Sequence, residues 1–223
     1  LKQNGPLMSA LYWMKSMPLL LKCRSAKNGN RPPMNRINGE NIMLVKQMDS
    51  LVLLIDMQEK LAPVIDQGKE VEQAAAWVLQ IAVQLGVPVL ATEQYPQGLG
   101  VTLPALAELV PAEHVMEKIH FSALREPLIA ERLKLSGKTQ LVIIGTETHV
   151  CVLQTAMDAL TAGYQVFIVE EAVGSRTEQN RQLALLRLQQ AGAQIISKEM
   201  LAFEWLDKAG TESFRTISKG WIR

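Results

Sequence analysis

The chain has 223 residues, which suits one sizeable α/β domain and is short for two. With 48% hydrophobic residues, 20% charged residues and a net charge of +1, it resembles an ordinary folded protein, with no electrostatic reason to bind nucleic acid or an anionic membrane. Two cysteines are too few for a disulfide framework, and no apolar run is long enough to span a bilayer, so we expect a cytoplasmic protein.

The first 48 residues differ from the rest of the chain. Residues 1–39 contain no Asp or Glu but seven Lys and Arg residues. A basic segment without acidic residues is typical of an organelle-targeting peptide, and it also fits an upstream extension before Met43 or Met48. We therefore expect residues 1–48 to be a poorly ordered leader or extension, and residues 49–223 to form a single domain.

From residue 49 onward, apolar runs that predict strands alternate with segments of helical spacing. In chain order the expected elements are strand 51–55, helix 69–85, strand 87–91, helix 104–109, strand 114–116, helix 128–135, strand 140–144, helix 149–161, strand 165–169, helix 177–190, strand 194–196 and a helical tail over 200–218. This alternation predicts an α/β fold of three layers, a six-stranded, mostly parallel sheet with helices on both faces and three strands on each side of a switch point.

Three reactive side chains fall where the predicted strands end. Asp56 ends the first strand, Lys118 follows the third, and Cys151 lies in the turn after the fourth. Ligands of parallel sheets bind outside the carboxyl ends of the strands, so these side chains are expected to converge on one crevice. Taken singly, a buried cysteine, a turn-capping aspartate and a solvated lysine are ordinary, but their conjunction favours a catalytic site.

Cys151 is the candidate nucleophile of this site. A thiol attacks as its thiolate, and a position in the first turn of a helix is expected to lower the pKa of Cys151 through the helix dipole and free backbone N–H groups. The same N–H groups are suited to hold an oxyanion. Lys118 adds positive charge, and Asp56 is placed to take the thiol proton and return it to a leaving group.

Three segments around these residues resemble the catalytic motifs of the isochorismatase-like cysteine hydrolase superfamily. They are LLIDMQ at 53–58, EKIHFSA at 117–123 and GTETHVCV at 145–152, and the downstream segments QTA at 154–156, GY at 163–164 and EAVGSR at 171–176 agree with the family as well. The resemblance runs from about residue 51 to the C-terminus. It implies the Rossmann-like fold of that family, in one hydrolase domain over residues 49–223.

The resemblance also assigns roles to residues of this chain. It implies that Asp56 is the general acid/base, Lys118 the charge-stabilising lysine and Cys151 the nucleophile. The family usually has a cis non-proline peptide before the cysteine turn, here Thr146–Glu147. By the same analogy, the backbone N–H groups of Glu147 and Cys151 form the oxyanion hole.

Three further residues are candidates for binding substrate. Gln58 is expected to line the site, and Tyr95 and Arg176 lie in loops that are expected to pass above it. Arg176 is equally well explained as a structural tether to the following helix.

The sequence predicts neither a metal nor another cofactor. Nicotinamidases of the superfamily bind a metal through an Asp and several His residues after the second strand, whereas residues 91–98 contain no His. The histidines of the chain, His114, His120 and His149, show no ligand spacing. The substring GLG at 98–100 lacks the third glycine of a dinucleotide fingerprint and indicates a turn.

The expected activity is hydrolysis of the C–N bond of a small-molecule amide through a cysteine thioester. Two alternatives stay open: an isochorismate-type vinyl-ether hydrolase, which needs proton transfer more than a sulfur nucleophile, and a non-catalytic oligomeric scaffold. The resemblance also implies a homo-oligomer. Apolar residues of the C-terminal segment, among them Leu201, Phe203, Trp205 and Leu206, are available either for a subunit interface or for covering the sheet.

Overall fold

The computed structural model describes residues 36–37, 40–41 and 44–222. The leader predicted over residues 1–48 therefore lies mostly outside the described residues, apart from a short antiparallel pair of β1 (Arg36–Ile37) with β2 (Glu40–Asn41) and the residues from 44 onward. The packed chain begins earlier than residue 49, because Val45 is fully buried and its backbone N–H donates to the Glu204 carboxylate at 2.6 Å.

Six strands form one sheet in the order β5-β4-β3-β6-β7-β8, and every pairing in it is parallel. The strands are β3 (Ser50–Ile55), β4 (Val89–Gln94), β5 (Val115–Lys118), β6 (Gln140–Thr146), β7 (Gln165–Gly174) and β8 (Gln194–Ile196). Chain order reverses between β3 and β6, which leaves three strands on each side of this switch point. The predicted three-layer α/β architecture is confirmed.

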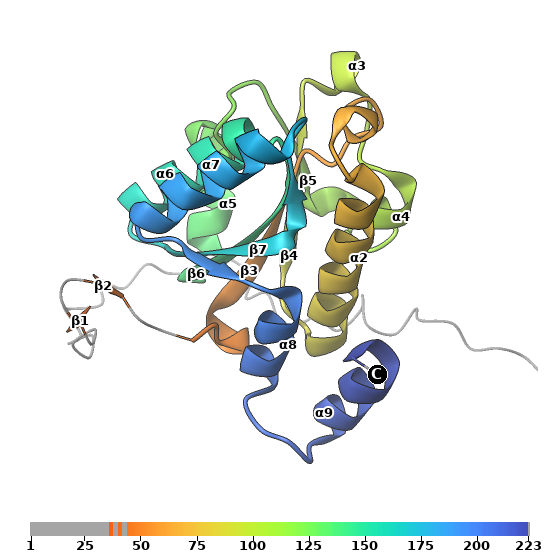
Figure 1. Cartoon of the computed structure of the whole chain (residues 1–223), viewed down its shortest axis with the longest axis vertical. Helices are drawn as coiled ribbons and strands as arrows, with labels where there is room; N and C mark the ends of the chain where they lie inside the picture. The colour runs from red at the N-terminus through yellow and green to blue at the C-terminus, as the bar shows by residue number, and fades with distance from the viewer. Residues whose placement is uncertain (1–35, 38–39, 42–43, 223) are drawn as a thin grey trace, which may run out of the picture. The chain divides into compact units, whose positions relative to one another are not determined.

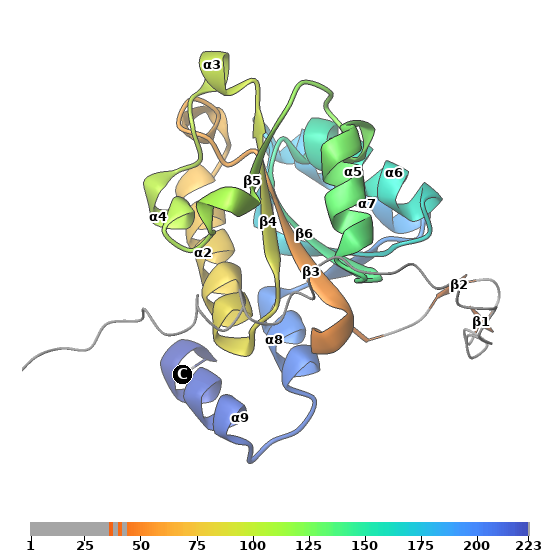
Figure 2. The same ribbon diagram turned by 180° about the vertical axis from the view of Figure 1, so that it is seen from behind.

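Helices cover both faces of the sheet (Figures 1 and 2). One face carries α2 (Gly68–Leu85), α4 (Pro104–Ala107), α8 (Lys198–Leu206) and α9 (Glu212–Ile217), and the other carries α5 (Pro127–Leu135), α6 (Leu153–Thr161) and α7 (Glu178–Gln190). A one-turn helix, α3 (Pro96–Leu99), follows β4. Within the described part of the chain, no helix is both long and apolar enough to cross a membrane.

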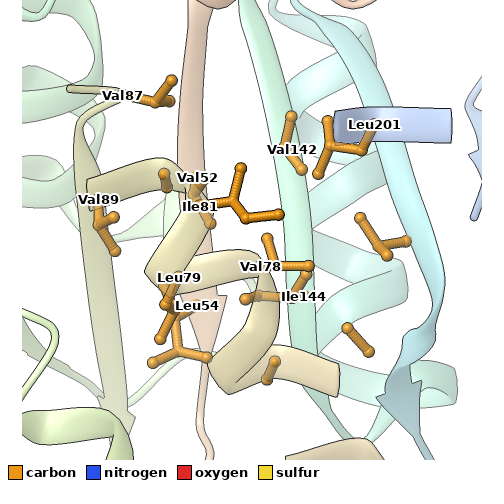
Figure 3. Packing of buried hydrophobic residues seen from close by; sticks show 14 of the residues in the cluster. Val52, Leu54, Val78, Leu79, Ile81, Val87, Val89, Val142, Ile144 and Leu201 are labelled. Atoms are coloured by element: carbon orange, nitrogen blue, oxygen red, sulfur yellow. The ribbon is translucent and has the colours of Figure 1, made fainter. Parts of the chain in front are cut away.

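The central strand β3 shows why the sheet is buried on both sides. Val52 and Leu54 point into the core beneath α2, whereas Leu53 and Ile55 point into the core beneath α5 to α7. Figure 3 shows Val52 beside Ile81 of α2 and Leu54 beside Leu79 of the same helix. A strand enclosed in this way is held firmly, so the residue that follows it has a well-fixed position.

The C-terminal segment covers the sheet within the same chain. Leu201, Trp205 and Leu206 are buried in the core, and the Trp205 indole N–H donates to the Ser50 hydroxyl at 3.0 Å. Of the four apolar residues considered for a subunit interface, Phe203 alone is exposed, at 45%. For the other three, the intramolecular alternative is the correct one.

Candidate active site

At the switch point the end of β6 lies against the end of β3. Ile55 and Gly145 are register partners, and a Cβ on Gly145 would lie 2.1 Å from the Ile55 carbonyl oxygen. Gly145 also has a φ of 139°, which side-chain-bearing residues rarely adopt. A glycine is therefore required here, and the close approach places the turn that carries Cys151 beside Asp56.

Asp56 and Lys118 form an ion pair that is closed to solvent. Lys118 Nζ lies 2.7 Å from Asp56 Oδ2, and both side chains are 0% exposed. The second carboxylate oxygen, Oδ1, accepts the hydroxyl of Thr92 at 2.7 Å. Burial raises the pKa of Asp56, and the charge of Lys118 opposes this rise only in part. Asp56 is therefore a stronger proton acceptor than an exposed aspartate.

The Lys118 ammonium is surrounded by oxygen atoms. Besides Asp56, it donates to the Gln94 side-chain oxygen at 2.6 Å and contacts the carbonyl oxygens of Phe121 and His120 at 3.2 and 3.3 Å. An ammonium group has three protons, so these acceptors engage all of them. The lysine thus serves Asp56 as a fixed positive charge.

Cys151 joins this pair, as the strand-end argument predicted. Its thiol is 3% exposed and hydrogen-bonds the Asp56 carboxyl group. Burial raises the pKa of Cys151 well above that of an ordinary thiol, and the charge of Asp56 raises it further. Residues 148–152 form a π-helical turn that runs into α6 at Leu153, so Cys151 does lie at a helix start, but the predicted lowering of its pKa is wrong because burial and the Asp56 charge outweigh this effect.

The turn before Cys151 is built differently from the family-based expectation. None of the peptide bonds among the described residues is cis, so the predicted cis bond at Thr146–Glu147 is wrong. Glu147, which precedes the π-helical turn, has a left-handed φ of 56°. Its carbonyl accepts from the Val150 N–H at 2.8 Å and closes the turn. The oxyanion-hole role of the Glu147 and Cys151 N–H groups stays a prediction.

Gln58 holds the backbone at the end of β4 and in the loop after it. It is fully buried, its side-chain oxygen accepts from the Gln94 N–H at 2.8 Å, and its amide nitrogen donates to the carbonyls of Gln94 and Gly100 at 3.1 and 2.6 Å. Gln58 therefore fastens the loop after β4, and the structure does not bring its side chain out to meet a substrate.

The other two predicted substrate-binding residues lie at the surface. Tyr95 follows β4 directly, and its side chain is 52% exposed. Arg176 binds both carboxylate oxygens of Glu147, at 3.0 and 3.1 Å, with a guanidinium that is itself largely exposed. This bidentate contact holds the turn that carries Cys151, so the partner that Arg176 binds is in that turn and not in the following helix, as the tether interpretation had it.

Two buried polar residues of the site were not predicted, Thr92 and Gln94. They end β4, a strand that is apolar up to Ala91 and then reads Thr-Glu-Gln, with all three of these side chains buried. Buried polar groups need partners, so a polar end to an apolar strand was a usable signal. The sequence thus indicated that these side chains need hydrogen-bond partners, but it did not indicate which residues the partners are.

Among the described residues, the structure also has a cleft away from the three catalytic candidates. A cleft of about 610 Å³ runs between α2, the end of β7 and the starts of α7 and α8, and none of Asp56, Lys118 and Cys151 lines it. No group of three or more His, Cys, Asp or Glu residues in the described ranges is placed to hold a metal ion. That the reaction needs no metal stays a prediction.

Comparisons with known proteins find relatives that match most of the chain. A family model of the isochorismatase domain matches residues 50–200. Isochorismatase domain-containing protein 2 of Rattus norvegicus is 39% identical over 170 residues, which cover 76% of this chain and 80% of the rat protein.

Two solved structures show the same architecture. The MAR1 ribonuclease of Caenorhabditis elegans has a TM-score of 0.75 and 30% identity, over 81% of this chain and 93% of that one. YcaC of Escherichia coli, described as an octameric hydrolase of unknown specificity, has a TM-score of 0.72 and 27% identity, over 75% of this chain and 84% of its own.

Proposed function

The chain belongs to the isochorismatase family, and from this premise we propose that it is a cysteine hydrolase that cleaves the C–N bond of a small amide through a thioester on Cys151. One observation carries the proposal: a buried thiol hydrogen-bonds a buried carboxyl group, Asp56, whose other partner is a buried lysine. A nucleophile, a proton acceptor and a fixed positive charge are the groups that this reaction needs.

Acylation begins with the proton on sulfur. Asp56 accepts the thiol proton as Sγ attacks the amide carbonyl carbon, so the thiolate does not have to exist free in the resting site. Backbone N–H groups of Glu147 and Cys151 hold the oxyanion. The C–N bond then breaks, and the amine or ammonia departs with the proton from Asp56.

Deacylation repeats these steps with water. Asp56 takes a proton from a water molecule, whose oxygen attacks the thioester carbonyl. The C–S bond breaks, the thiolate regains the proton from Asp56, and the carboxylic acid leaves. Lys118 keeps its charge beside Asp56 through both stages, which stabilises the carboxylate whenever it is ionised.

The amide reaction fits this site better than the two alternatives. Vinyl-ether hydrolysis depends on proton transfer to the substrate and gives no role to a sulfur atom that hydrogen-bonds the acid. A scaffold gains little from an enclosed ion pair, since buried ion pairs contribute weakly to stability compared with apolar residues of similar volume.

Further proposals concern partners and location. From the octameric E. coli relative we propose that this protein is a homo-oligomer, which size-exclusion chromatography with light scattering tests. We propose a small-molecule substrate, no metal or other cofactor, no nucleic-acid or membrane partner, and a cytoplasmic location, with organelle targeting as the alternative if the basic leader acts as a signal.

The decisive experiment combines a substrate screen with intact-mass analysis. The purified protein is incubated with small primary amides, a vinyl ether of the isochorismate type and RNA, and release of ammonia, of pyruvate or of cleaved RNA is measured. We expect ammonia and an acyl adduct on Cys151, both absent in Cys151→Ala and retained in Cys23→Ala, which removes the other cysteine of the chain. Unchanged turnover in Cys151→Ala would refute the covalent mechanism, and pyruvate or RNA cleavage would identify a different reaction.

A further inference from the structure

Gln94 and Lys118 are a cross-strand pair. They are register partners on the neighbouring parallel strands β4 and β5, so their side chains leave the sheet on the same side. The Gln94 side-chain oxygen accepts from Lys118 Nζ at 2.6 Å, and its amide nitrogen donates to the Ile119 carbonyl at 2.7 Å. One end of the amide faces a donor and the other an acceptor, which fixes its orientation.

The backbone of Gln94 is fastened as tightly as its side chain. The Gln94 backbone N–H donates to the Gln58 side-chain oxygen, and the Gln94 carbonyl accepts from the Gln58 side-chain nitrogen. The neighbouring Glu93 carboxylate accepts from the backbone N–H and the hydroxyl of Thr102, at 2.6 and 2.8 Å, which secures the far end of the loop. These hydrogen bonds therefore hold the Gln94 amide in place beside the lysine.

We propose that Gln94 is a positioning residue. Its neutral carboxamide holds the Lys118 ammonium against Asp56 without adding a second negative charge beside the lysine. The link to turnover rests on the proposed function, whereas the effect on the electrostatics of Cys151 does not. Because an amide oxygen accepts a hydrogen bond without a full negative charge, Asp56 stays the one anion in direct contact with the ammonium among the residues described.

A carboxylate in place of the amide tests this proposal. Gln94→Glu keeps the size of the side chain and adds a negative charge within reach of Lys118 Nζ, so the lysine is shared and the thiolate of Cys151 becomes less favourable. A like charge in a shared site raises a pKa by about one unit or more. Iodoacetamide alkylation of Cys151, followed by peptide mass analysis, should therefore be about tenfold slower than in the wild type at each pH from about 6 to 10.

Two comparison variants separate this effect from damage to the fold. Gln73→Glu adds the same charge on the exposed side of α2 and should alkylate like the wild type. Gln94→Asn keeps a neutral amide that is one methylene too short to span the contact. It should lower kcat about tenfold with KM little changed, because the lysine is displaced while the substrate-binding surface is intact.

The outcomes distinguish the two proposals. If the wild type hydrolyses no amide, the proposed function fails, and the alkylation rates still report on Gln94. If Gln94→Glu melts at the wild-type temperature and Cys151 alkylates at the wild-type rate, the positioning role is overturned. A kcat for Gln94→Asn equal to that of the wild type would overturn its role in turnover.

Discussion

Thr92 donates its hydroxyl to Asp56 Oδ1 at 2.7 Å, while the other oxygen of the same carboxylate pairs with Lys118. Thr92 lies on β4 and Lys118 on the neighbouring strand β5. Together the two contacts fix the plane of the carboxylate relative to the Cys151 thiol. The hydrogen bond from Thr92 also favours the ionised form of Asp56. Thr92 thus influences both the geometry and the charge of the proposed base.

Thr92→Val should impair catalysis without reshaping the core. Valine has nearly the same volume, but it leaves Asp56 Oδ1 without its donor, so the already raised pKa of Asp56 rises further. We expect kcat to fall about tenfold and the acidic limb of the pH–rate profile to move upward, because Asp56 must be ionised to act as base. Thr92→Ser, which keeps the hydroxyl, should retain most activity. An unshifted pH profile in Thr92→Val would contradict this role.

The sequence predicted the strand ends better than the contacts between them. Asp56, Lys118 and Cys151 were brought together by topology alone, since a parallel sheet gathers the carboxyl ends of its strands at one edge. The pairing of Gln94 with Lys118 depends on the register of β4 and β5, which no pattern in a single chain reveals. Backbone order was therefore predictable, and the partners of buried polar groups were not.

The error about the thiol of Cys151 has a physical origin. A helix start favours the thiolate, but the cost of burying a charge exceeds the benefit of a helix dipole. The structure encloses the thiol and places the Asp56 charge beside it, and both effects raise the pKa of Cys151. Depth of burial is set by the packing of α6 and the turn before it, which sequence spacing does not encode.

Asp56→Asn should separate reactivity of the thiol from turnover. The change removes a negative charge that disfavours the thiolate and leaves the positive charge of Lys118, so Cys151 should be alkylated faster at neutral pH than in the wild type. Turnover should fall by about 10²–10⁴-fold, because the asparagine cannot carry the proton.

The exposed carboxylate of Asp66 provides a matched control. Asp66→Asn removes the same charge outside the site and should change neither the alkylation rate nor turnover. Asp56→Asn also leaves the buried Lys118 without its ionic partner, at a cost of about 3–5 kcal/mol in stability, so circular dichroism should accompany the rates. Slower alkylation of Cys151 in folded Asp56→Asn would show that Asp56 assists the thiolate at rest.

Gly145→Ala should prevent the turn from packing beside Asp56. Its Cβ would collide with the Ile55 backbone, and its φ of 139° is unfavourable for alanine. We expect a loss of more than about 3 kcal/mol in the free energy of unfolding by urea. Gly163→Ala is the control, because Gly163 also has a positive φ but open space around its Cβ position. A similar loss in both variants would attribute the effect to φ alone.

Glu126 stabilises the loop that carries two of the Lys118 contacts. One oxygen of its carboxylate accepts from the backbone N–H groups of Ile119 and His120, at 2.9 and 3.0 Å, and from the His120 ring at 2.9 Å. These hydrogen bonds, with that from the His120 backbone the strongest influence, lower the pKa of Glu126 to about 2 from an ordinary 4.5. The ionised carboxylate is thus favoured in the folded state.

Glu126→Gln should therefore destabilise the protein in a pH-dependent way. A lowered pKa in the folded state gives a contribution that is complete above pH 4.5 and is lost as the pH falls through about 2. We expect Glu126→Gln to lower the free energy of unfolding by on the order of 1 kcal/mol at neutral pH, a modest figure because the group is partly solvated. The difference from the wild type should shrink below pH 4.5 and vanish near 2, as urea unfolding at several pH values would show. Glu131→Gln, at an exposed position of α5, should show no such trend, and a constant difference in Glu126→Gln would mean that its charge is not what holds the loop.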